Sequence, residues 1–192
     1  MNSFQYNKSS FKRYSWIDAL RGFAIILVVH FHVYGNISEY YYNTSNLIGY
    51  ITSVVAPLRM PILVFLSGLL VSGSILKGGK NYFLGKIKNI LYPYVVWTII
   101  MCVFYFLRAV FLNKESTVIF WEALIVSPIF HLWFLYYIFA YYIITFFVDR
   151  YNCFFVFPLL VFIKIFFAVD EYDKFLSLYL FFLMGSYAGR YL

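Results

Sequence analysis

The sequence predicts an all-α fold: a polytopic transmembrane helix bundle with about six spans. Hydrophobic residues make up 64% of the 192 residues and aromatic residues 25%, whereas only 12% are charged. A soluble domain has about 25% charged residues, and a chain this short has no core large enough to bury so much apolar surface. Disordered chains are poor in aromatic residues, so the composition excludes them as well.

Six apolar segments follow one another, most of them near the length that a helix needs to cross a bilayer. They cover residues 16–34, 47–76, 90–112, 128–148, 153–169 and 175–191. The first contains Asp18 and Arg21 and has no small-residue cleavage site, so it is interpreted as a span and not as a signal peptide. The second is too long for one straight crossing and contains Pro57 and Pro61, which interrupt helical hydrogen bonding. We expect an outer piece, a kink, and a crossing over residues 62–76.

The positions of Lys and Arg predict a cytoplasmic N-terminus in the cell membrane, with residues 1–15 as a cytoplasmic segment. In this orientation nine Lys and Arg residues lie inside and three outside. The inner nine are Lys8, Lys12, Arg13, Lys77, Lys80, Lys86, Lys88, Arg150 and Arg190, and the outer three are Arg108, Lys114 and Lys174. The net charge of +7 therefore reads as an orientation signal, and no basic stripe suggests nucleic acid as a partner.

The two cysteines, Cys102 and Cys153, show neither the spacing of a metal site nor a CxxC pair. We expect no metal and no disulfide framework.

Arg21 and His32 are the leading candidates for chemistry, because ionisable side chains at membrane depth are costly unless they have a function. They are eleven residues apart, so they share one helix face with a rise of about 16 Å, whereas His30 lies on the opposite face. Neutral imidazole can accept a proton from a hydroxyl group, and arginine suits a phosphate or carboxylate. Asp18 can pair with Arg21. The alternative is that Arg21 snorkels to the interface beside Asp18 and that the histidines are satisfied polar residues.

Arg59, His131 and Trp133 are further candidates. Arg59, beside the proline kink, could bind an anionic acceptor or a thioester oxygen, and the alternative is an anchor for lipid headgroups. His131 starts the fourth span at the level of His32, so both could line an acceptor site, although a simple interfacial position also explains His131 and Trp133.

Lys86 and Lys88, with Lys77 and Lys80, form a cytoplasmic patch that suits the phosphates of a coenzyme A thioester. The alternative is that these lysines only set the topology.

Glycines predict close helix packing at two places. Gly185 and Gly189 form a GxxxG pattern, and Gly68 follows Ser67 in the second apolar segment.

Five ordered motifs resemble the acyltransferase-3 family of integral membrane acyltransferases. The first is SWIDALRG at residues 15–22, followed by His32. The others are residues 59–61 with 65–68, residues 91–94, residues 131–135 and residues 181–185. Family members usually have more spans, so the resemblance implies that residues 16–192 form an acyltransferase-like domain without its usual C-terminal portion. The family's cytoplasmic arginine pair is matched here by Lys86 and Asn89.

The resemblance implies a membrane O-acyltransferase that moves an acyl group, expected to be acetyl, from cytoplasmic acyl-CoA to a hydroxyl of an extracytoplasmic glycan or polysaccharide. Arg21 would contact the donor and His32 would serve in acyl transfer. Acyl-CoA is then a co-substrate and no cofactor is bound, and the expected partners are membrane lipid, a carbohydrate acceptor and a partner membrane protein. The alternative is a transporter or a non-catalytic membrane subunit of the same fold.

Overall fold

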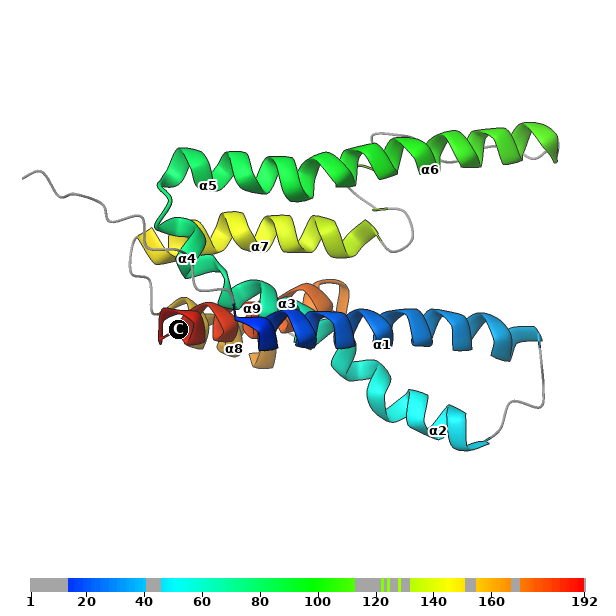
Figure 1. Ribbon diagram of the computed structural model, residues 1–192, viewed down its shortest axis with the longest axis horizontal. Helices are drawn as coiled ribbons and strands as arrows, with labels where there is room; N and C mark the ends of the chain where they lie inside the picture. The colour runs from blue at the N-terminus through cyan, green and yellow to red at the C-terminus, as the bar shows by residue number, and fades with distance from the viewer. Residues whose placement is uncertain are drawn as a thin grey trace, which may run out of the picture. The chain divides into compact units, whose positions relative to one another are not determined.

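The computed structural model describes residues 14–40, 46–112, 122, 124, 128, 132–150, 155–166 and 170–191. All the elements within these residues are helical, which confirms the all-α part of the prediction (Figure 1). They are α1 (Ser15–Tyr40), α2 (Asn46–Val55), the 3₁₀ turn η1 (Ala56–Leu58), α3 (Arg59–Leu69), α4 (Val71–Ile75), α5 (Gly79–Lys86), the π-helical turn η2 (Ile87–Leu91), α6 (Tyr92–Phe111), α7 (Trp133–Arg150), α8 (Val156–Phe166), α9 (Asp170–Ala188) and the 3₁₀ turn η5 (Gly189–Tyr191). The chain forms two compact units: unit 1 is Met1–Leu63 and unit 2 is Val64–Leu192.

Three helical stretches of the described chain are long and apolar enough to cross a membrane: Ser15–Gly35, Leu47–Ile75 and Gly79–Phe111. Trp133–Asp149 is apolar but shorter. The described helices therefore support three of the six predicted spans by length and composition. Helix α8 has 11 residues, about 16 Å of rise, which is less than the hydrocarbon core of about 30 Å. Helix α9 begins with charged residues that shorten its apolar part.

The predicted kink in the second apolar segment is confirmed. Helix α2 ends at Val55, and η1 carries Pro57 in its first residues, where a missing N–H is tolerated. The predicted crossing over residues 62–76 is itself divided, because Leu70 leaves helical geometry (φ −91°, ψ 1°) between α3 and α4.

The third apolar segment starts earlier than predicted, because the helical stretch runs from Gly79 through η2 into α6. Gly78 precedes it with a φ of +88°, a conformation that favours glycine. Pro93 lacks an N–H and crowds the carbonyl four residues before it. The π turn just before Pro93, where the Tyr92 N–H bonds to the Ile87 carbonyl, widens the helix at that point.

Glycines let α3 and α9 touch through their backbones in unit 2. A Cβ added at Gly68 would overlap the carbonyl oxygen of Phe182, and one added at Gly185 would overlap that of Phe65. A Cβ at Gly189 would likewise overlap the Leu69 carbonyl oxygen. The close packing predicted for these glycines is therefore confirmed.

Helices α7 and α9 run in the same direction. The Lys174 ammonium lies 3.4 Å from the centre of the Trp133 ring at one end, and Arg190 pairs with Asp149 at the other. The glycine contacts place the C-terminal ends of α3 and α9 together as well. Thus α3, α7 and α9 are parallel within unit 2, as alternate crossings of a membrane would be.

Helices α5 and α6 run opposite to α7, beside which they lie in Figure 1. The Phe83 ring packs on Phe146 at 4.6 Å between centroids, and farther along Tyr94 packs near Tyr136 at 6.0 Å. The residue numbers rise on one helix as they fall on the other, so the two are antiparallel.

We expect Gly68→Ala and Gly185→Ala each to lower the stability of the protein by about 1–3 kcal/mol, because the added methyl group must separate two backbones. Gly22→Ala is the matched control, since a Cβ there meets no atom of the described chain within 4 Å. Thermal unfolding of the purified protein in detergent measures the effect. Wild-type unfolding temperatures for both core variants would contradict the close packing.

Candidate active site

Arg21 and Asp18 form the predicted pair on α1, with 3.9 Å between Arg21 Nη1 and Asp18 Oδ1. Both side chains are more than one-third exposed, at 36% and 41% of their surface, so the pair contributes little to stability. Arg21 therefore remains accessible to an anionic ligand. His32 lies about 16 Å farther along the helix, so only an elongated molecule could touch both residues.

His30 joins α1 to α2. Its Nε2 lies 2.9 Å from Thr52 Oγ1, and that hydroxyl donates its hydrogen to the Ile48 carbonyl at 2.8 Å. Because the only hydroxyl hydrogen is already used, Thr52 Oγ1 accepts from His30, which places a hydrogen on Nε2. His30 thus makes the separate contacts that its position opposite Arg21 predicts.

His32 and Arg59 both contact the Phe31 ring, a grouping that the sequence did not predict. The His32 ring meets Phe31 at 5.4 Å between centroids and an interplanar angle of 77°. The guanidinium carbon of Arg59 lies 3.5 Å from the centre of the same ring. We call these three residues the Phe31 cluster. Both distances end on one ring, so Phe31 joins the imidazole and the guanidinium in one group of contacting side chains.

The Arg59 guanidinium is held from two sides within unit 1. Phe31 covers its face, and Nη1 donates to the Ala56 carbonyl at 2.8 Å. Its Nε is buried and has no hydrogen-bond partner among the described residues. Buried polar groups normally have a partner, so this N–H is an unsatisfied donor.

Lys86 is packed against aromatic rings of unit 2. Its ammonium lies 3.6 Å from the centre of the Tyr142 ring and 5.2 Å from that of Tyr82, and its Nζ lies 3.4 Å from Ser74 Oγ. Lys88, in the π turn, is exposed. Of the two predicted donor-binding lysines, Lys88 is therefore the one whose side chain extends from the surface of the unit.

Of the two predicted acceptor residues in the fourth apolar segment, the structure describes only Trp133. Trp133 starts α7, and the Lys174 ammonium lies over its ring at 3.4 Å, so this face of the indole is already covered. His131 lies outside the described residues.

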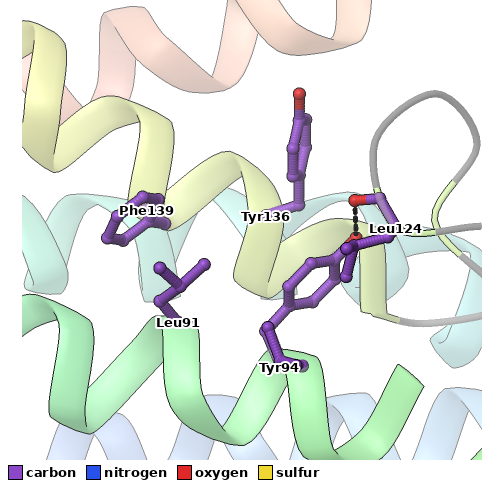
Figure 2. A pocket seen from close by; sticks show the side chains of 6 residues that line it. Leu91, Tyr94, Leu124, Tyr136 and Phe139 are labelled. Carbon is purple, nitrogen blue, oxygen red and sulfur yellow. Dashed lines mark hydrogen bonds between the residues drawn. The ribbon is translucent and has the colours of Figure 1, made fainter. Parts of the chain in front are cut away.

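One cavity of about 340 Å³ lies between α6 and α7 in unit 2 (Figure 2). Its walls are aliphatic and aromatic: Leu91, Tyr94, Val95, Leu124, Tyr136 and Phe139. Figure 2 shows the Tyr94 hydroxyl bonded to the Leu124 carbonyl, at 2.7 Å. None of its lining residues is a predicted site residue, and none is a general base at neutral pH. The cavity therefore suits a hydrocarbon group.

A metal centre gains no support from the part of the chain that the structure describes, which holds no group of three or more His, Cys, Asp or Glu side chains.

We expect Lys86→Ala to lower the unfolding temperature, because it removes a cation–π contact that typically contributes about 0.5–2 kcal/mol. Lys88→Ala is the matched control and should unfold at the wild-type temperature. If both lysines also bind acyl-CoA phosphates, each variant raises the apparent KM for acyl-CoA. Equal unfolding temperatures for the two variants would contradict the structural role of Lys86.

Comparison with known proteins agrees with this architecture. A family model described as an acyltransferase domain, that of acyltransferase family 3, matches residues 14–192. A search of curated proteins and a search of solved structures each found no match. Because the match covers nearly the whole chain, with Arg21, His32, Arg59, Lys86 and Lys88 inside it, the chain belongs to the acyltransferase-3 family.

Proposed function

We propose that this protein is a membrane O-acyltransferase. It moves an acyl group, expected to be acetyl, from cytoplasmic acyl-CoA to a hydroxyl of an extracytoplasmic glycan or polysaccharide. The family supports acyltransferase activity, and apolar helices support a membrane location. The observation that carries the proposal is the Phe31 cluster, where a candidate base and a fixed cation contact the same ring within a matched acyltransferase domain.

In this proposal His32 is the general base. Its imidazole takes the proton of the acceptor hydroxyl as the oxygen attacks the thioester carbon. An ester C–O bond forms, the C–S bond breaks, and the proton passes to the leaving thiolate of coenzyme A. Neutral imidazole suits this role because its pKa in water lies near physiological pH.

The donor would lie along α1. Arg21 is accessible and can hold an anionic group of the donor, while the reactive thioester extends toward His32, about 16 Å away. Lys86 and Lys88 would contact the phosphates of acyl-CoA. His131 and Trp133 would lie on the acceptor side, and Arg59 would lie where the acyl group passes from donor to acceptor.

The proposed topology is multi-pass in the cell membrane, with about six spans and a cytoplasmic N-terminus. The parallel arrangement of α3, α7 and α9 supports it, because alternate crossings share a direction. The pairing of Arg190 with Asp149 places a basic residue at the C-terminal end of α7, the end that this topology assigns to the cytoplasm.

Mass spectrometry of cell-surface glycans, from cells with and without the intact gene, tests the proposed function. The proposal predicts an acyl ester on a glycan that disappears when the gene is deleted and returns when it is restored. Unchanged glycan acylation would contradict the proposal and favour a transporter or a subunit that acts with a partner membrane protein.

The two histidines should differ in their effect on catalysis. His32→Ala should lower acyl transfer at least about 10²-fold, the low end for removing a general base. His30→Ala should cost much less activity, because it removes a hydrogen bond to Thr52 and leaves the proposed base in place. The measurement is glycan acylation normalised to the amount of protein in the membrane. Equal losses would indicate a folding role for both, and full activity of His32→Ala would exclude it as the base.

The topology predicts opposite labelling of Lys80→Cys and Asn43→Cys, introduced separately after Cys102 and Cys153 are replaced. Asn43→Cys should react in intact cells with a thiol reagent that cannot cross the membrane. Lys80→Cys should react only after the cells are opened. Reaction of Lys80→Cys in intact cells would reverse the proposed orientation.

A further inference from the structure

We infer that Arg59 stabilises the negative charge that develops on the acyl carbonyl oxygen during transfer, with its buried Nε–H as a hydrogen-bond donor. This inference rests on the proposed function and deepens it. The sequence left two chemical roles open for Arg59, an anionic acceptor and the thioester oxygen, and the geometry of unit 1 favours the second.

The first observation is that the guanidinium is fixed before any substrate arrives. It stacks on Phe31 at 3.5 Å and donates from Nη1 to the Ala56 carbonyl at 2.8 Å. Donors that are already oriented need no reorganisation when charge develops, which is why they lower the barrier of acyl transfer. Arginine also keeps its proton in proteins, so the positive charge is permanent.

The second observation is the burial of Arg59 Nε without a hydrogen-bond partner in the described chain. Leaving a buried donor unsatisfied is unfavourable, and more so for a charged group. An acyl oxygen that binds during the reaction would supply the missing partner.

The third observation is the position of Arg59 relative to the candidate base. Arg59 lies on the face of the Phe31 ring and His32 lies at 5.4 Å from the same ring. Arg21, by contrast, pairs with Asp18 and lies about 16 Å along the helix from His32. The cation that contacts the same ring as the base is therefore Arg59, and Arg21 is left to hold a distant part of the donor.

The groups already named account for every proton and electron pair in the acyl-transfer step. The acceptor oxygen forms a bond to the acyl carbon as His32 takes its proton, and the carbonyl π electrons move onto the oxygen that Arg59 contacts. The C=O bond then re-forms, the C–S bond breaks, and the imidazolium returns the proton to the thiolate. Arg59 neither gains nor loses a proton.

Kinetics of Arg59→Leu and Arg59→Gln test the inference. Membranes come from cells in which the gene is deleted and each variant is supplied, so they contain the natural glycan acceptor. Labelled acetyl-CoA is the donor probe, and label in the glycan is measured as donor and acceptor are varied. Arg59→Leu should lower kcat about 10²–10³-fold, the usual loss for one such donor, with little change in either KM. Arg59→Gln retains an N–H donor and should lose less.

Two controls separate this role from a structural one. Phe31→Leu removes the stacking contact and leaves the guanidinium in the protein, so it should lower kcat much less than Arg59→Leu. Arg108→Leu removes an exposed arginine of α6 and should leave kcat unchanged.

Several results would overturn the inference. A wild-type kcat in Arg59→Leu with a raised acceptor KM would make Arg59 an acceptor anchor. Unchanged kinetics would make it a headgroup anchor. An equal loss in Phe31→Leu, or failure of both Arg59 variants to reach the membrane, would make its role structural. Absence of transfer by the wild-type protein would instead contradict the proposed function, so the two failures are distinguishable.

Discussion

A tyrosine hydroxyl buried among membrane helices needs a protein acceptor for its hydrogen, because hydrocarbon offers no water, and this requirement orders unit 2. The Tyr82 hydroxyl donates to the Tyr142 carbonyl, and the Tyr142 hydroxyl donates to the Ser67 carbonyl, each at 2.9 Å. These two bonds connect α5 to α7 and α7 to α3. The Tyr141 hydroxyl donates to the Phe175 carbonyl at 2.8 Å, which adds α9. Backbone contact at the glycines then brings α3 and α9 together.

The same requirement explains why the polar residues of unit 1 differ in what they can do. His30 donates its Nε2 hydrogen to the Thr52 hydroxyl oxygen, and this bond holds α1 and α2 together. Arg59 uses Nη1 on a carbonyl and the face of its guanidinium on Phe31, yet keeps a buried Nε–H without a partner in the described chain. A polar group that folding leaves unsatisfied is one that a substrate can satisfy. For this reason we place the reacting acyl group at the Phe31 cluster.

Features determined by neighbouring residues could be predicted from the sequence. The break at Pro57 follows from the missing N–H of proline, and the pairing of Asp18 with Arg21 follows from their spacing on one helix. Contacts between distant segments could not be predicted. Arg59, just after η1, contacts the Phe31 ring of α1, and the Lys86 ammonium lies over the Tyr142 ring of a helix much later in the chain. Composition and spacing identify these cations as unusual, but they do not specify which side chains contact them.

The central claim is that acyl transfer occurs at the Phe31 cluster of unit 1 and not in the apolar cavity of unit 2. An acyl-CoA that carries a photoreactive diazirine in its acyl group tests this claim most directly, with cross-linked peptides identified by mass spectrometry and unlabelled acetyl-CoA as competitor. The account predicts adducts on Phe31 and on the segment that contains Arg59, both lost with the competitor. Competitor-sensitive adducts on Tyr94 and Tyr136, with none in unit 1, would contradict it.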